Sequence, residues 1–322
     1  MRHSAQDSSL SSGQAIRVLV TGAGGFAGAG IALALNRAGF SVFSHVGRGG
    51  ESGGADLTSE ADVARLLKGA SPDVIVHTAA ISSSDACERE RDEAFRVNVG
   101  ATMHLVQQAS HRSAGLQTHR PPYFIHLSTD LVFDGGVAPR GGFTERDEVC
   151  PRSVYGLSKL ESEQIVLGSS LERSVLRLSL LYGRSPSARQ GFLGWMAGGI
   201  RAGGPVRLFV DEWRTPLLLS DLSEVVRRLV VAWGEGRLTA DSELLHVSGS
   251  ERVSRHDFGV RYCEHFGLSP DAIVGVRQAD VASVAPRSPD VSLSNEKLQR
   301  VLGYCPATVE EGLKLLREDF GA

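Results

Sequence analysis

The sequence lacks the features that mark disulfide-bonded, zinc-binding and membrane proteins. Its 322 residues include only four cysteines, scattered without a C-x-x-C pair, which excludes a disulfide framework and a zinc knuckle. No apolar run reaches the roughly 18 to 20 residues that span a bilayer, and no apolar stretch near the N-terminus resembles a secretory signal. We therefore expect a cytoplasmic protein with reduced thiols, no metal and no membrane partner.

The chain also lacks a strong charge of either sign. Its formal net charge is −3 at pH 7, so it offers no concentrated positive field to a nucleic acid. A small molecule therefore remains the expected partner, and a homodimer stays open. The length, with 42% hydrophobic residues, suffices for one large α/β domain and a smaller attached one.

Short apolar runs alternate with segments of helical periodicity from residue 16 onward. The runs cover 16–21, 40–44, 73–80, 123–128 and 174–183, and the main helix-like segments cover 59–69, 93–110 and 153–168. This alternation predicts an α/β fold with a Rossmann-type, doubly wound parallel sheet between helices. We expect a polar tail over 1–15, the sheet domain over 16–180 joined by 213–235, and a smaller C-terminal substrate-binding cap over 181–322.

A glycine cluster separates the first apolar run from the first helix-like segment. It contains Gly22, Gly25 and Gly28 at the spacing G-x-x-G-x-x-G, with Phe26 between the last two. Glycines let the backbone turn sharply and approach a dinucleotide pyrophosphate, whose charge faces the helix N-terminus. In a chain with 37 glycines the spacing alone is weak evidence. Its place between a strand and a helix favours a dinucleotide site over an ordinary turn.

Tyr155 and Lys159 lie four residues apart in a predicted helix, which puts a phenol and an ammonium on one face. A nearby ammonium favours the phenolate, so we expect Lys159 to lower the pKa of Tyr155 from its usual value near 10. Thr129 follows a predicted strand, at the sheet edge where catalytic groups gather, and its hydroxyl can donate to a carbonyl oxygen. These residues indicate proton transfer to a carbonyl, against the alternative of a solvated helix pair.

The segments TGAGGFAG, STD-x-VF and YGLSK, in this order, resemble the extended short-chain dehydrogenase/reductase family. LSTDLVFDG, EWRTPLLLSDLSEVV and PRSPDVSLSNEKLQRVLG are similar to its dTDP-4-dehydrorhamnose reductase branch, and the resemblance runs from residue 16 to the end. It implies a reductase that uses NAD(P)H to reduce a keto group, namely the 4-keto group of a nucleotide-linked deoxysugar.

The resemblance also implies roles for individual residues. Thr129, Tyr155 and Lys159 would form the catalytic trio, with Tyr155 as proton donor and Lys159 at the nicotinamide ribose. The other implied cofactor-binding positions are Gly22, Gly25, Phe26, Gly28, Asp56, Leu57, Ala79, Ala80, Asn98 and Ser128, and the implied substrate positions are Ser82, Thr129, Asp130, Tyr155 and Arg287. Two alternatives stay open: Asp56 could cap the following helix, and Asn98 could satisfy buried backbone groups.

Cofactor choice depends on the end of the second predicted strand, where an acidic residue would accept the ribose hydroxyls of NAD. No carboxylate occurs from Phe40 to Gly50, whereas His45 and Arg48 could face a 2′-phosphate. We therefore expect NADP(H) to be favoured and NAD(H) to be the alternative. The competing interpretation of Arg48 is a solvated residue at the edge of a loop.

Three departures from the family pattern bear on the substrate. Leu131 and Leu180 stand where the branch usually has tyrosine and tryptophan, and Ser288 replaces a proline after Arg287. Leu131 also stands where related sugar dehydratases have the glutamate needed for elimination, which argues against that reaction. An epimerase that recycles NAD, and a non-catalytic regulatory subunit such as the methionine adenosyltransferase β subunit of this branch, remain alternatives. The intact trio favours the reductase.

Overall fold

The computed structural model describes residues 15–47, 54–115, 120–136, 138–188 and 191–318, which leaves Arg48 and all but the last residue of the expected tail outside the description. Its centre is a six-stranded parallel sheet in the order β10-β5-β4-β3-β1-β2. The strands are β1 (Arg17–Thr21), β2 (Ser41–His45), β3 (Val74–His77), β4 (Tyr123–Thr129), β5 (Arg173–Leu178) and β10 (Leu244–Val247). The predicted Rossmann-type sheet is confirmed.

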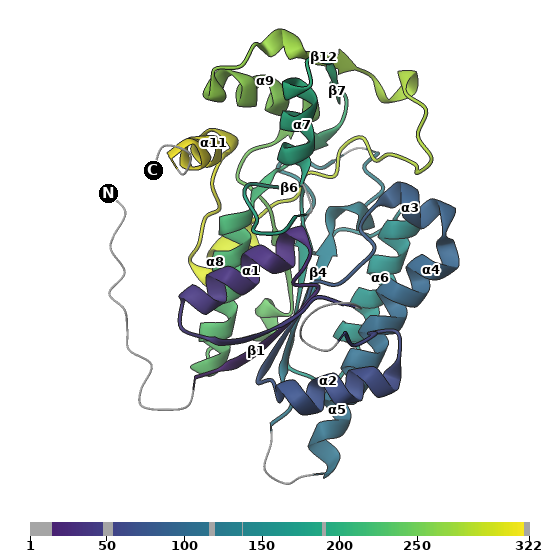
Figure 1. Ribbon diagram of the computed structural model, residues 1–322, viewed down its shortest axis with the longest axis vertical. Helices are drawn as coiled ribbons and strands as arrows, with labels where there is room; N and C mark the ends of the chain where they lie inside the picture. Colours follow the sequence, from purple (N-terminus) through teal and green to yellow (C-terminus); the bar gives the residue numbers. More distant parts are fainter. Residues whose placement is uncertain (1–14, 48–53, 116–119, 137, 189–190, 319–322) are drawn as a thin grey trace.

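Helices cover both faces of this sheet because successive strand residues point to opposite sides. Val18 and Val20 pack toward one face and Leu19 toward the other, and all three are buried. One face holds α1 (Phe26–Arg37), α8 (Leu219–Gly234) and α10 (Glu296–Leu302), and the other holds α2 (Glu60–Ala70), α5 (Ala101–Gly115) and α6 (Val154–Leu167) (Figure 1).

The order of the strands reverses beside β1, which positions the site. From β1 the chain passes to β2 at the edge of the sheet and then returns to β3 on the other side of β1. In open α/β sheets, ligands bind outside the carboxyl ends of the strands at such a switch point. The turns after β1 and β3 are therefore the expected walls of a binding crevice.

The helix expected over 93–110 is interrupted. After α3 (Ser84–Arg89), the chain forms α4 (Arg91–Phe95), a π-helical turn (Arg96–Gly100) and then α5. The extra residue per turn changes which side chains face inward, and such turns are frequent at functional sites. Here the turn buries Asn98.

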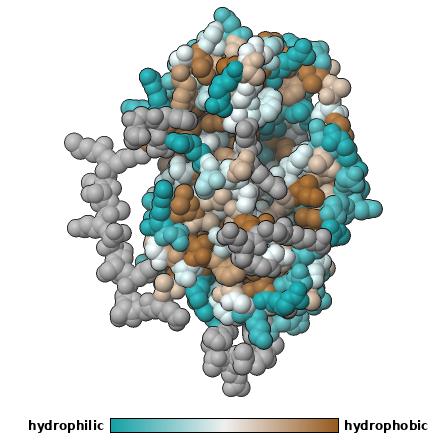
Figure 2. All heavy atoms as spheres, in the orientation of Figure 1, coloured by the Kyte–Doolittle hydropathy of each residue, from teal (hydrophilic) through white to brown (hydrophobic). Residues whose placement is uncertain are grey.

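A smaller unit lies beyond the carboxyl edge of the sheet, above it in Figure 1. It contains β6 (Leu181–Tyr182), α7 (Phe192–Arg201), β7 (Val206–Phe209), β8 (Trp213–Arg214), β9 (Leu217–Leu218), β11 (Val253–Ser254), α9 (Arg255–Phe266), β12 (Ile273–Val276) and α11 (Val309–Glu318), with short 3-10 turns at Pro270–Ala272 and Gln278–Asp280. Two further 3-10 turns belong to the sheet domain, Asp130–Val132 after β4 and Ala240–Ser242 before β10. Its own core includes Tyr182, Met196 and Phe258. Figure 2 shows the whole molecule in the same orientation, with polar residues around the periphery and paler or apolar ones toward the middle.

One segment of the expected cap belongs to the central sheet. Leu244–Val247, which we placed in the cap over 181–322, pairs with β5 as the edge strand β10. A four-residue strand gives almost no periodic signal, and His246 interrupts its apolar run. Helix α8, part of the segment 213–235 that we expected to join the sheet domain, packs against α1. Across the described ranges, no helix combines the length and the apolar character that crossing a membrane requires.

Candidate active site

Two adjoining cavities follow the carboxyl ends of the strands. The first, of about 510 Å³, is lined by Thr129, Tyr155 and Lys159, and we call it the Tyr155 cavity. The second, of about 610 Å³, is lined by Asp56 and Leu57, and we call it the Asp56 cavity. Their walls share Gly22, Gly25, Thr78, Ala80 and Ser82. The structure thus joins both predicted site regions at the β1–α1 turn.

The β1–α1 turn requires glycine at particular positions. Gly22 has φ +72°, and a Cβ there would lie 2.7 Å from the backbone of Ala79. A Cβ on Gly28 would lie 2.3 Å from the Gly22 carbonyl oxygen and 2.6 Å from Thr78 Oγ1. Helix α1 begins after Gly25 with no side-chain cap, so its first N–H groups have no side-chain acceptor. A turn of this form suits phosphate oxygens.

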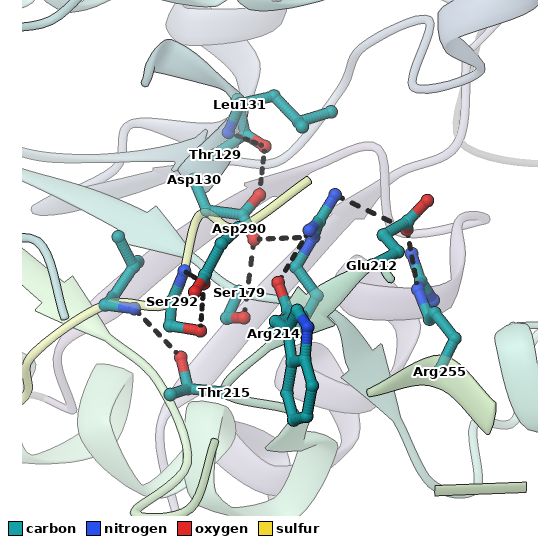
Figure 3. A network of polar contacts seen from close by, with 12 residues as sticks. Thr129, Asp130, Leu131, Ser179, Glu212, Arg214, Thr215, Arg255, Asp290 and Ser292 are labelled. Atoms are coloured by element: carbon teal, nitrogen blue, oxygen red, sulfur yellow. Dashed lines mark hydrogen bonds and ion pairs between the residues drawn. The ribbon is translucent and has the colours of Figure 1, made fainter. Parts of the chain in front are cut away.

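Thr129 and Asp130 stand at the end of β4 and are both buried. Thr129 Oγ1 donates to Asp130 Oδ1 at 3.1 Å, and the Asp130 Oδ2 atom lies 3.6 Å from Arg214 Nε and accepts from Ser179 Oγ at 3.4 Å (Figure 3). Burial raises the pKa of Asp130, and Arg214 opposes this effect. Asp130, an expected substrate position, lines the Tyr155 cavity, but its carboxylate already contacts Thr129, Ser179 and Arg214.

Tyr155 lies in the first turn of α6, which begins where Ser153 Oγ accepts the Gly156 N–H. Burial raises the pKa of its phenol, the Asp130 carboxylate raises it further, and a hydrogen bond with Thr129 opposes both. Our expectation that Lys159 lowers this pKa is wrong for the structure as it stands. The reason is geometric, because the Lys159 ammonium contacts another partner.

That partner is His126 on β4. Lys159 Nζ lies 3.1 Å from His126 Nε2, and both side chains are buried. Burial lowers the pKa of Lys159 to about 8, and Glu163 opposes it. Burial, and then the Lys159 charge, also hold the pKa of His126 well below its usual range, so the ring is neutral and its Nε2 can accept from the ammonium. Sequence reasoning missed His126 because a lone histidine in an apolar strand carries no signal.

Glu163 lies one helical turn beyond Lys159 on α6 and, like it, is buried against the sheet. Its carboxylate forms an ion pair with Arg177 at 2.8 Å, with both side chains almost fully buried. It also accepts a hydrogen bond from Ser128 Oγ, the side chain expected beside the nicotinamide. Ser128 lines the Tyr155 cavity, so this bond fixes the orientation of a wall residue.

Asn98 supports the site from outside the cavity walls. Its Oδ1 accepts from the Ile81 N–H at 2.8 Å, and its Nδ2 donates to the Ile81 carbonyl oxygen at 3.1 Å and to Ser158 Oγ at 2.9 Å. Asn98 therefore ties the segment after β3 to α6, and it lines neither the Tyr155 cavity nor the Asp56 cavity. Of our two interpretations, the geometry favours the satisfaction of buried backbone groups.

The Asp56 cavity contains most of the other expected cofactor positions, Leu57, Ala79 and Ala80 among them. Asp56 Oδ1 accepts from the N–H and the hydroxyl of Thr58, while Ser59 caps α2. Asp56 is therefore not the helix cap. His45 lines the same cavity but is buried, with its Nε2 bonded to the Ala55 carbonyl oxygen at 2.9 Å.

Arg287 lies outside the Tyr155 cavity. It lines a neighbouring pocket of about 250 Å³, the Arg287 pocket, together with Leu131, and its Nη1 is 3.3 Å from Glu212 Oε2. Arg214 and Arg255 line both this pocket and the Tyr155 cavity. Sequence reasoning missed them. The charges of E-W-R before an apolar run were a signal for Glu212 and Arg214, whereas Arg255 begins a polar helix turn and gave none.

The comparisons with known proteins agree with this geometry. The family model described as "RmlD substrate binding domain" matches residues 16–321. The chain is 32% identical to a probable low-salt glycan biosynthesis reductase of Haloferax volcanii, covering 82% of this chain and 83% of that protein. It is 30% identical to a dTDP-4-dehydrorhamnose reductase of Mycobacterium tuberculosis, covering 88% and 87%.

A solved structure shows the same fold. The dTDP-4-dehydrorhamnose reductase of Bacillus anthracis, in complex with NADP, superimposes with a TM-score of 0.82 at 22% identity, covering 95% of this chain and all of that one. With the family model matched almost from end to end, this chain belongs to the RmlD substrate binding domain family of extended short-chain dehydrogenases/reductases.

Proposed function

We propose that this protein is an NAD(P)H-dependent reductase of a nucleotide-linked keto sugar, with NADP(H) favoured and NAD(H) as the alternative. One observation carries the proposal. Thr129, Tyr155 and Lys159 line a single cavity whose wall continues into the glycine turn after β1. A phenol, a hydroxyl and an ammonium beside a phosphate-binding turn form the set that carbonyl reduction by a dinucleotide requires.

The residues present fit a dinucleotide. The tight turn that Gly22 and Gly28 permit lines the Tyr155 cavity and supports pyrophosphate binding, and the Asp56 cavity has room for the adenosine half. In the division that we propose, the sheet domain, including α8 and β10, binds the cofactor, and the cap binds the sugar nucleotide, whose remainder extends toward Arg287. We expect a homodimer to be compatible with this arrangement.

A bound NAD(P)H would supply the hydride. Tyr155 donates the proton, and the raised pKa keeps its phenol protonated at neutral pH, the form that a reduction consumes. Thr129 Oγ1 donates to the carbonyl oxygen as negative charge develops there. Lys159 lines the same cavity, so its ammonium would hold the ribose of a bound cofactor and would stabilise the phenolate that proton transfer leaves on Tyr155.

The test is cofactor oxidation with a panel of dTDP- and UDP-linked 4-keto sugars. We expect the wild type to consume one NADPH per new hydroxyl group, and Tyr155→Phe to bind NADPH without turning over. Sugar conversion without net cofactor consumption would instead indicate an epimerase. Cofactor binding without turnover of any sugar would indicate a regulatory subunit.

A further inference from the structure

Arg255 lies where the Tyr155 cavity meets the Arg287 pocket. It is the first residue of α9, it lines both spaces, and its side chain is 19% exposed. Tyr155 lines only the first space and Arg287 only the second. A ligand that reaches from the catalytic trio toward Arg287 therefore passes Arg255.

The guanidinium of Arg255 is held in place from two sides. Its Nε donates to Glu212 Oε1 at 2.9 Å, and its Cζ lies 4.9 Å from the centre of the Phe192 ring (Figure 3 shows the first contact). The Arg255 backbone N–H also donates to the Glu212 carbonyl oxygen at 3.0 Å. A side chain ordered in this way loses little conformational entropy when it binds a ligand.

The terminal nitrogens of Arg255 make no hydrogen bond to another residue that the structure describes, although arginine carries five N–H donors and only the one on Nε is used. Arg214, beside it, has a protein partner at each of its three side-chain nitrogens. Its Nε lies 3.6 Å from Asp130, its Nη1 donates to the Trp213 carbonyl oxygen at 2.6 Å, and its Nη2 lies 3.4 Å from Glu212. Of these two arginines, Arg255 alone offers donors to the cavities.

Charge favours an anion at this place. The carboxylate of Glu212 contacts three guanidiniums, at 3.4 Å for Arg214, 2.9 Å for Arg255 and 3.3 Å for Arg287. One carboxylate balances one guanidinium, and Asp130 balances Arg214 from the other side. The two carboxylates of Glu212 and Asp130 thus face three guanidiniums, and one positive charge stays uncompensated near Arg255 and Arg287.

We propose that Arg255 binds an anionic group of the sugar-nucleotide substrate, an inference that rests on the proposed function. The group is a phosphate of the diphosphate link or a carboxylate on the sugar, since both present paired oxygens to the fork of a guanidinium. Asp85, the other acidic residue of the Arg287 pocket beside Glu212, accepts the Ala285 N–H at 3.0 Å, and among the described residues the ion pair of Arg255 is with Glu212.

The experiment is calorimetric titration of the full chain, saturated with NADP⁺, with dTDP, dTDP-glucose and dTDP-glucuronate, and with the three UDP counterparts. The variants are Arg255→Gln, Arg255→Lys and, as a matched control, Arg237→Gln, which removes an exposed arginine paired with Glu235. We expect Arg255→Gln to weaken binding on the order of 10-fold to 100-fold, Arg255→Lys to retain part of the affinity, and the control to match the wild type.

The set of ligands distinguishes a phosphate of the diphosphate from a sugar carboxylate as the group that Arg255 binds. Equal losses for the diphosphate, the glucose and the glucuronate compounds assign the phosphate to Arg255, whereas a loss confined to the glucuronates assigns a sugar carboxylate. Unchanged affinity of Arg255→Gln for every ligand overturns the inference while leaving the proposed function intact. A wild type that binds none of these compounds overturns both. If Arg255→Gln does not fold, Arg255→Lys decides: wild-type affinity for every ligand would show that the fork geometry contributes nothing and overturn the inference.

Discussion

Nζ of Lys159 and Nε2 of His126 lie 3.1 Å apart in the buried layer beneath the Tyr155 cavity. The neutral imidazole accepts from the ammonium, but it adds no negative charge that would hold the proton. Burial therefore dominates and brings the pKa of Lys159 to about 8. The charge that we propose for ribose binding thus has a pKa of about 8, close to neutral pH.

The first prediction concerns cofactor affinity and pH. Because the pKa of Lys159 in the folded protein is lowered, the ammonium is present below about pH 8 and is lost as the pH rises through that value. We expect the dissociation constant of NADP⁺ to be flat below about pH 7, to be roughly doubled near pH 8 and to rise above that pH by at most about 10-fold per pH unit. Fluorescence titration to pH 9.5 measures this. Lys159→Met should bind weakly at every pH, and a flat wild-type curve up to pH 9.5 would contradict the assignment.

The second prediction concerns the proton donor. Tyr155→Phe should lower kcat by roughly 100-fold or more with little change in NADPH affinity, because only the proton donor is removed. Steady-state kinetics with a sugar that the wild type reduces, combined with an NADPH titration, checks both parts. Tyr304→Phe, which removes a phenol bonded to Asp221 away from both cavities, is the matched control. Equal kcat values for Tyr155→Phe and the wild type would exclude Tyr155 as the donor.

The third prediction concerns the glycine turn. Gly28→Ala places a Cβ 2.3 Å from the Gly22 carbonyl oxygen, so the turn must open and NADP⁺ binding should weaken by at least about 10-fold. Gly69→Ala in α2 is the control, because its Cβ would meet no atom within 4 Å and the residue lines neither cavity. Titration with NADP⁺ and thermal unfolding compare the two, and equal behaviour would show that the turn adapts to a side chain.

The fourth prediction concerns stability. Glu163→Gln leaves the buried guanidinium of Arg177 without a counter-charge, and we expect the free energy of unfolding to fall by about 3 to 5 kcal/mol. Glu224→Gln breaks ion pairs of partly exposed arginines and should cost less than about 1 kcal/mol. Urea denaturation of both variants measures the difference. A loss for Glu163→Gln no greater than that of the control would mean that Arg177 finds another partner.

Most of the sheet could be predicted from the sequence because its signals are local. The apolar runs at 73–80 and 123–128 became β3 and β4, and the glycine spacing marked the β1–α1 turn. Strand β10 was not predicted, because an edge strand of four residues has too short a hydrophobic pattern to be distinguished from a loop. The π-helical turn was not predicted for a related reason, since one extra residue hardly changes the spacing of apolar residues over 93–110.

By itself the sequence determined which chemical groups are present and the spacing that fixes their relative positions. Tyr155 and Lys159 share a helix face because four residues complete about one turn, and this holds whatever surrounds the helix. Only the tertiary structure decided what each group contacts. Arg255 meets Glu212 across 43 residues of chain, and Lys159 meets His126 across 33. Such pairs form because a buried charged group loses its hydration and needs a hydrogen-bonding partner in the protein. Only the folded chain brings that partner close.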